Sequence, residues 1–188
     1  MSLERIFIVL LRETKPSSNF SLNNLPGSGR IDLLCRIINA SFFLSNDFRK
    51  DTELYAFFMS YGKYLHIKGS EVKGISPDER SIAGSLKKVF SGGSQSGFIF
   101  KPGSWIEIFQ NFQNLVLLDP EGVQTDHLTN LPRIFVLGDH LGLKAEEKSC
   151  FTKQDKLSLG KIVYLGSNCI TILHYLLDQI DSSNQSKS

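Results

Sequence analysis

The sequence has 188 residues, of which 41% are hydrophobic and 21% charged, and its net charge is +2. This length suffices for one domain with a buried core, and the small net charge does not by itself indicate a nucleic-acid binder. No apolar run approaches the roughly 18 residues that cross a bilayer, so we expect a cytoplasmic protein. The cysteines are odd in number and far apart, which argues against a disulfide framework and against a zinc site; they are Cys35, Cys150 and Cys169.

The first third of the chain predicts a strand, a long loop and a helix. Residues 5–11 are a continuous β-branched and apolar run, which is typical of a buried strand. A polar loop with two prolines and two glycines follows. Apolar residues then recur at helical spacing from Ile31 to Phe42, which predicts a helix with Ser28 as its N-terminal cap.

The middle of the chain continues the alternation. Apolar runs predict strands at 52–59 and 64–69, and a helix is predicted over 75–90. The start of that helix combines a cap, a proline at the first helical position and a capping box; these residues are Ser76, Pro77 and Glu79.

The last part of the chain brings strands that run into glycines. The expected elements are a helix at 104–112, a strand at 114–122, a strand and glycine loop at 133–143, a glycine-broken apolar segment at 156–166, a helix at 167–180 and a disordered polar tail at 181–188. Strands that alternate with helices predict an α/β fold with a mostly parallel sheet. We expect a single domain over residues 1–180.

Three of the predicted strands end in glycine-bearing loops, with the sequences LLDPEG, VLGDHLG and KLSLG. In open α/β sheets ligands bind outside the carboxyl ends of the strands, and glycine lets a ligand approach the backbone closely. The alternative is that these glycines only form turns. The dinucleotide fingerprint GxGxxG and the phosphate loop GxxxxGK[ST] are both absent, which argues against nicotinamide and nucleoside-triphosphate sites.

Four segments resemble a known family in the order in which the family has them. They are LPGSGRIDLLCRIINASFFLSNDFRKDTELY at 25–55, SPDER at 76–80, VLGDHLGL at 136–143 and LSLGKIVYLGSNCITILHYLLD at 157–178. The chain resembles the archaeal tRNA (pseudouridine-54 N1)-methyltransferases, the TrmY family of the SPOUT superfamily. It departs from the family at Lys161, where proline is common, and at Asn168, where histidine is common.

The resemblance implies a fold, a cofactor and an assembly. The fold is a mostly parallel sheet flanked by helices with a C-terminal trefoil knot, which pattern alone would not predict. The cofactor is S-adenosylmethionine, no metal is required, and the protein works on tRNA as a homodimer. The residues expected to contact the cofactor are Leu118, Leu137, Gly138, Leu157, Ser158, Leu159, Gly160, Leu165 and Cys169.

Methylation of pseudouridine at N1 needs an acceptor for the N1 proton and a positive group near the ring carbonyls. Arg30 is a candidate for holding a phosphate or a ring oxygen, and Asp32 or Asp139 for the base. Alternatively, Asp32 pairs with Arg36, which follows one helical turn later. The alternative for Asp139 is a purely structural role, in which it hydrogen-bonds the backbone of its own turn. Basic residues that could contact the tRNA backbone are Arg30, Arg36, Arg49 and Lys50.

Other interpretations remain open. Cys169 lies near the start of the last helix, where a thiolate would be stabilised, but N1 methylation needs no covalent adduct, so we expect Cys169 to pack near the cofactor. We expect His174 to be a partly buried structural histidine. The rival functions are an rRNA pseudouridine methyltransferase of the same fold, a non-catalytic RNA-binding module and an unrelated Rossmann-type enzyme.

Overall fold

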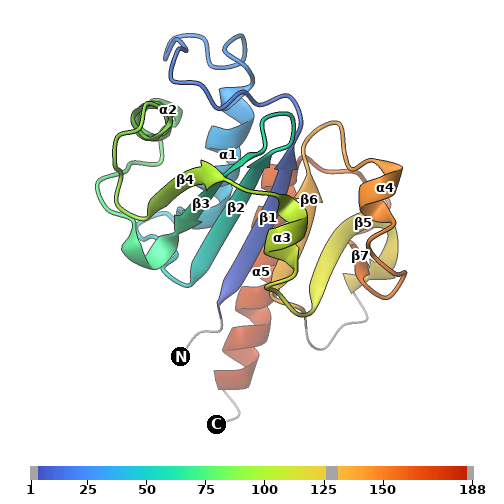
Figure 1. The fold of residues 1–188 in the computed structure, drawn as a ribbon. Helices are drawn as coiled ribbons and strands as arrows, with labels where there is room; N and C mark the ends of the chain where they lie inside the picture. The colour runs from blue at the N-terminus through green and yellow to red at the C-terminus, as the bar shows by residue number, and fades with distance from the viewer. Residues whose placement is uncertain (1–3, 126–130, 186–188) are drawn as a thin grey trace.

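The computed structural model describes residues 4–125 and 131–185, which form a seven-stranded sheet with helices on both faces (Figure 1). The strands lie in the order β4-β3-β2-β1-β6-β5-β7. Their bounds are β1 Arg5–Leu11, β2 Thr52–Phe58, β3 Lys63–Lys68, β4 Phe98–Pro102, β5 Leu115–Gln124, β6 Ile134–Gly138 and β7 Lys156–Ser158. The α-helices are α1 Ile31–Phe42, α2 Glu79–Phe90, α3 Trp105–Phe109, α4 Ala145–Lys148 and α5 Gly166–Gln185.

The sheet is mostly parallel, as the sequence predicted. Strand β1 pairs in parallel with β2 and β6, and β5 pairs in parallel with β6 and β7. Only the β2–β3 and β3–β4 pairs of the described sheet are antiparallel. The α/β class and the flanking helices are therefore confirmed, whereas the trefoil knot stays a prediction of the family resemblance.

Two apolar layers cover the two faces of the sheet. One layer packs the sheet against α1, α2 and α5, and the other packs it against α3. All seven residues of β1 are buried, which explains why this strand is a continuous apolar run rather than an alternating one. Figure 1 shows α1 and α5 together behind the sheet and α3 in front of it.

Two predicted helix starts are wrong. The N-cap of α1 is Arg30 in a left-handed conformation, while Ser28 bonds within the preceding loop to the carbonyl of Asn24. Helix α2 begins at Glu79 with Asp78 as the cap, whose carboxylate accepts from the backbone N–H of Ser81. In both places the sequence offers a serine that is a suitable N-cap, but the helix begins two residues later than that serine would allow.

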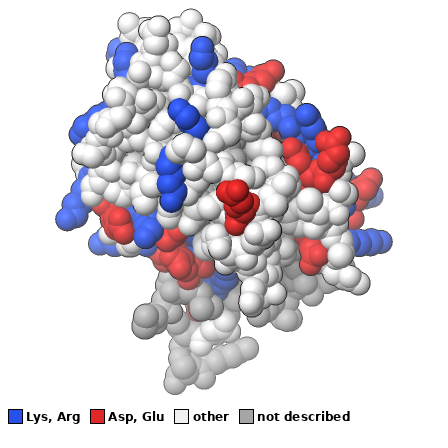
Figure 2. Space-filling view, viewed as in Figure 1, with Lys and Arg blue, Asp and Glu red and all other residues white. Residues whose placement is uncertain are grey.

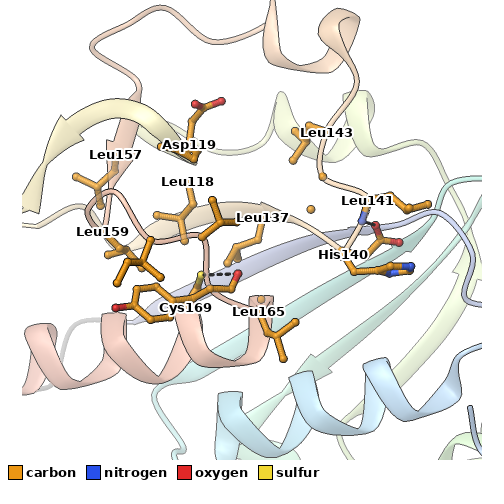
Figure 3. A pocket seen from close by; sticks show the side chains of 18 of the residues that line it. Leu118, Asp119, Leu137, His140, Leu141, Leu143, Leu157, Leu159, Leu165 and Cys169 are labelled. Carbon is orange, nitrogen blue, oxygen red and sulfur yellow. Dashed lines mark hydrogen bonds between the residues drawn. The ribbon is translucent and has the colours of Figure 1, made fainter.

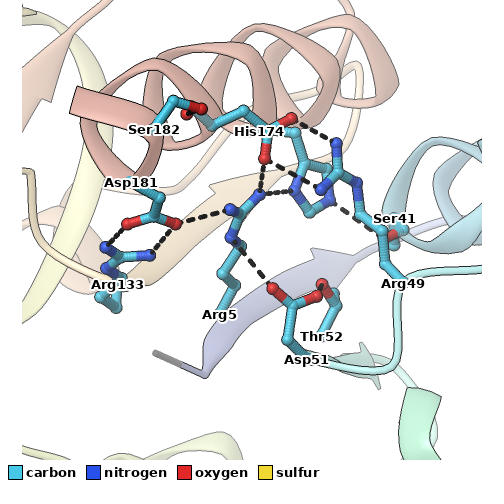
Figure 4. A network of polar contacts seen from close by, with 10 residues as sticks. Arg5, Ser41, Arg49, Asp51, Thr52, Arg133, His174, Asp181 and Ser182 are labelled. Carbon is cyan, nitrogen blue, oxygen red and sulfur yellow. Dashed lines mark hydrogen bonds and ion pairs between the residues drawn. The ribbon is translucent and has the colours of Figure 1, made fainter. Parts of the chain in front are cut away.

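The last helix runs further than the sequence indicated. The prediction ended it at residue 180, but α5 continues to Gln185. Asp181, placed by the sequence in the polar tail, pairs with Arg5 on β1 across 2.9 Å and also pairs with Arg133. These ion pairs hold the end of the helix against the sheet (Figure 4).

Strand β4 and helix α4 were not expected from the sequence. Strand β4 extends the antiparallel edge of the sheet beside β3. Among the residues that the structure describes, no helix is both long and apolar enough to span a bilayer.

Candidate functional site

A cavity of about 470 Å³ lies beside the middle of β5, the carboxyl ends of β6 and β7 and the start of α5. Its walls come from β5 and from the glycine-bearing loops that follow β6 and β7 (Figure 3). Of the nine residues expected to contact the cofactor, eight line this cavity: Leu118, Leu137, Gly138, Leu157, Leu159, Gly160, Leu165 and Cys169. The structure therefore brings together segments that are up to about fifty residues apart in the chain, as the close approach of parallel strand ends requires.

Ser158 is the exception among the nine. Its side chain is buried and does not line the cavity. The Ser158 hydroxyl accepts from the backbone N–H of Gly160 across 3.1 Å and donates to the carbonyl of the same glycine. Gly160 has a φ of 112°, a conformation that side-chain-bearing residues rarely adopt. Ser158 thus shapes the loop from inside.

The turn after β6 is held by Asp139. One carboxylate oxygen accepts from the backbone N–H of Arg12 across 2.7 Å, and the other accepts from that of Leu141 across 2.9 Å. A Cβ added to Gly138 would meet the backbone of Gly142 at 2.7 Å, so the turn closes tightly only with glycine there. These contacts support the alternative in which Asp139 bonds backbone within its turn.

An ion pair lies in the wall of the mostly apolar cavity. Asp119 is buried at the end of the β5 apolar run and accepts from Lys148 Nζ across 2.9 Å. Burial alone would raise the pKa of Asp119, but the bonds from Lys148 and from the backbone of Glu121 outweigh it and lower the pKa. A charged carboxylate here can accept hydrogen bonds from ligand hydroxyls. The sequence pattern treated Asp119 only as part of a turn.

Cys169 is not an activated thiol. Its Sγ lies 3.8 Å from the carbonyl oxygen of Tyr164, a contact drawn in Figure 3. Burial raises the pKa of Cys169, which keeps the thiol protonated. The geometry agrees with the packing role expected for this residue.

Arg30, Asp32 and Arg36 form one cluster at the start of α1. Both arginines bond the Asp32 carboxylate, Arg30 Nε across 3.2 Å. Burial would raise the pKa of Asp32, but these two guanidinium groups outweigh it and lower the pKa. A carboxylate stabilised in this way is a weaker base, so the structure favours the ion-paired alternative for Asp32.

The Arg30 backbone is strained, with a φ of 56°. Such strain in a residue with a side chain costs on the order of 1–3 kcal/mol and is found preferentially at functional sites. The pKa of Arg30 is raised by its bond to Asp32 and, to a smaller extent, by the charges of Glu13 and Asp139. The charge of Asp139 in the turn after β6 therefore acts on Arg30.

A narrow cleft next to the cavity is lined in part by Arg36, one member of this cluster. The cleft has a volume of about 20 Å³ and is lined by Arg36 of α1 and by residues 138–140 and 165–167. Of the predicted catalytic residues, Arg30 is the N-cap of α1, Asp32 lies in its first turn, and Asp139 borders both cavities. The sequence did not single out His140, which borders both cavities as well.

Arg49 does not join the predicted basic edge. Its guanidinium donates two hydrogen bonds to Asp178 of α5, across 3.1 and 2.6 Å, and its side chain is mostly buried. Lys50, the next residue, is exposed. Figure 2 shows Lys and Arg side chains scattered over one face and mixed with acidic ones, not gathered into a single patch. This ion pair favours a structural role for Arg49, and its role in RNA binding stays a prediction.

Among the described residues, no group of three or more His, Cys, Asp or Glu side chains is placed to hold a metal ion.

The chain is similar to known proteins over nearly its whole length. Residues 4–182 match a family described as "Putative SAM-dependent RNA methyltransferase". A Methanocella arvoryzae protein named tRNA (pseudouridine(54)-N(1))-methyltransferase is 34% identical, covering 93% of this chain and 99% of its own length. A Methanocaldococcus jannaschii protein of the same name is 33% identical, covering 93% of this chain and 97% of its own length.

The fold has a counterpart among solved structures. Archaeoglobus fulgidus Nep1, crystallised with S-adenosylhomocysteine, superposes with a TM-score of 0.66 over 97% of this chain and 100% of the Nep1 chain. The two sequences are 12% identical, so the likeness concerns the fold.

Proposed function

The chain belongs to the family of SAM-dependent RNA methyltransferases, and we propose that it transfers a methyl group from S-adenosylmethionine to N1 of pseudouridine 54 in tRNA. One observation carries this proposal. Eight residues that the family resemblance assigns to the cofactor line one cavity, although they come from three separate segments of the chain.

The cavity fits the proposed cofactor in size and chemistry. Its volume of about 470 Å³ is in the range of sites for small ligands. Leucines from three loops supply apolar surfaces for a flat adenine ring, and the glycines leave main-chain groups accessible. The Asp119 carboxylate, held ionised by Lys148, supplies an acceptor for ribose hydroxyls or for the amino group of the cofactor.

The chemistry asks little of the protein beyond alignment. When bound, S-adenosylmethionine supplies a methyl group on a positively charged sulfur that is already activated for transfer. The residues of this chain must orient the uracil ring and exclude competing nucleophiles. The guanidinium groups of Arg30 and Arg36, positioned on Asp32, can steady negative charge that develops on the ring carbonyls.

The RNA is proposed to reach the site over the start of α1. Arg36 and Arg30 are partly exposed there, and Lys50 is exposed beyond the other end of the helix. Contacts of this kind to phosphates give an affinity that falls as salt rises. A tRNA substrate also supports the cytoplasmic location expected from the sequence.

The homodimer is part of the same proposal. Residues 162–165, which form one wall of the cavity, are four consecutive apolar residues whose exposed fractions are 67%, 79%, 39% and 51%. Apolar groups in such a continuous run are usually covered by a partner. Sedimentation of the full chain in solution tests this, and a monomer at micromolar concentration would contradict it.

The function is tested by incubating the protein with S-adenosylmethionine and two tRNA T-arm hairpins, one with pseudouridine and one with uridine at the target position. Nucleoside mass spectrometry should show N1-methylpseudouridine only in the first. An rRNA hairpin containing pseudouridine forms a third arm. Methylation of the rRNA hairpin alone would support the rRNA enzyme, and a protein that binds tRNA but no cofactor would support the non-catalytic module.

A further inference from the structure

The turn after β6 places a histidine where the two cavities meet. His140 lines the large cavity and also the narrow cleft that Arg36 lines. Figure 3 shows His140 at the edge of the large cavity, with its imidazole extending away from the leucines that form the walls. A base that reached the large cavity from the side of α1 would therefore lie near this side chain.

Among the described residues, two titratable side chains border both cavities, Asp139 and His140. Both carboxylate oxygens of Asp139 already accept backbone N–H groups, and protonation would weaken the bonds that hold the turn. An imidazole is well matched to proton transfer near neutral pH. His140 is thus the better proton acceptor of the two.

A carboxylate lies next to the imidazole. The Nε2 atom of His140 lies 3.3 Å from the carboxylate of Glu13, which is in the loop after β1. An N–H at Nε2 that points to Glu13 leaves the lone pair on Nδ1 available to a ligand. The Glu13 charge also stabilises the imidazolium that forms when Nδ1 takes a proton, as a carboxylate does for histidine in hydrolase triads.

We propose that His140 accepts the N1 proton of the target pseudouridine and that Glu13 positions the His140 imidazole. This inference rests on the proposed function. The N1–H bond breaks and its proton moves to Nδ1 of His140. The electron pair on N1 forms the new bond to the methyl carbon, and the carbon–sulfur bond breaks with its pair left on sulfur, which gives neutral S-adenosylhomocysteine. The imidazolium then returns its proton to water.

Three charged groups lie around His140. Glu13 is next to its imidazole, Asp139 precedes it in the same turn, and Arg36 lines the same cleft. An imidazolium has no lone pair to accept the N1 proton. A methyl transfer that uses a neutral imidazole should therefore slow under acid conditions.

Single-turnover methylation of the pseudouridine hairpin tests the proposal between about pH 6 and pH 9. We expect His140→Ala and His140→Gln to lower the rate about 100-fold and to abolish the acid limb of the pH profile. Glu13→Gln should lower it less. Affinity for S-adenosylmethionine, measured by calorimetry, should stay unchanged. The control is His66→Gln, a histidine that bonds Glu53 in the sheet and lines neither cavity.

Imidazole in solution provides the decisive readout. It should restore part of the rate of His140→Ala in proportion to its neutral form, which loss of a merely structural contact would not allow. Unchanged rates in both His140 variants, or a reduced rate that keeps the wild-type pH profile and is not restored by imidazole, would overturn the proposal. A wild-type protein that methylates neither hairpin would overturn the proposed function and this inference together.

Discussion

Arg5, the first residue of β1, donates a hydrogen bond from its guanidinium to Nδ1 of His174 in α5 across 3.1 Å (Figure 4). The other ring nitrogen of His174 donates to the carbonyl of Ser41 at 3.0 Å, so the imidazole is neutral with its proton on Nε2. This contact ties the first strand to the last helix, which begins at the cavity wall.

The buried His174 should make stability depend on pH. Burial, together with the charges of Arg49 and Arg5, lowers its pKa from 6.5 to about 3. Between these values the unfolded chain binds a proton that the folded chain does not, so this contribution to stability is present above pH 6.5 and is lost as the pH falls towards 3. The slope from one such group is at most about 1.4 kcal/mol per pH unit.

Urea unfolding at several pH values measures this dependence. His174→Gln should be less stable than the wild type near neutral pH but should show a shallower loss of stability below pH 6.5, because the titrating group is gone. Equal slopes for the two proteins would contradict a neutral, buried His174.

Substitutions of Arg49 and Arg30 should have different effects, the first on stability and the second on RNA binding. Arg49→Ala removes two hydrogen bonds to Asp178, which keeps its ion pair with Arg5. We expect a loss of about 1–2 kcal/mol in unfolding free energy, because Asp178 is partly exposed and solvent screens the pair. The tRNA affinity should stay close to that of the wild type.

Arg30→Ala should have the opposite effect. Asp32 keeps Arg36 as its partner, so the fold should change little, while filter binding should show a tRNA affinity about tenfold lower. If Arg49→Ala weakens tRNA binding more than Arg30→Ala at equal stability, the assignment of Arg49 to the α5 ion pair is wrong.

Gly138→Ala should impair the cofactor cavity. The added methyl would lie 2.7 Å from the backbone of Gly142, and backbone has to move to make room. We expect affinity for S-adenosylmethionine to fall about tenfold or more in calorimetry.

Gly84→Ala is the matched control for that substitution. An added methyl at Gly84 in α2 has no heavy atom within 4 Å, and alanine should stabilise the helix by about 0.5–1 kcal/mol without affecting cofactor binding. Equal cofactor affinities for the two variants would argue against the tight turn at Gly138.

The three thiols should react with iodoacetamide in a defined order. Cys150 is exposed and should react first, whereas burial raises the pKa of Cys35 to about 12 and should make it the slowest. Cys169 should react at an intermediate rate and be protected by S-adenosylmethionine, since it lines the cavity. Peptide mass spectrometry measures all three.

Cys169→Ala tests whether this thiol takes part in catalysis. The variant should keep activity, because the mechanism forms no bond to sulfur of the enzyme. A correctly folded but wholly inactive Cys169→Ala protein would contradict the packing role.

The sequence by itself determined the alternation of strands and helices. Local patterns carry this information because a strand buried on both faces, such as β1, must be apolar throughout, and a turn that closes tightly on its own backbone needs glycine, as at Gly138. The segments that resemble a known family supplied the chemistry.

Only the tertiary structure decided what the charged residues do. Arg49 and Arg30 are both arginines in polar segments of the sequence. The fold nevertheless places Arg49 against Asp178, 129 residues further along the chain. His140 becomes a candidate proton acceptor because the loop after β1 brings Glu13 next to it and α1 brings Arg36 to the same cleft. The energy of a charge depends on its burial and on its partners, and both are set by contacts that are distant in sequence.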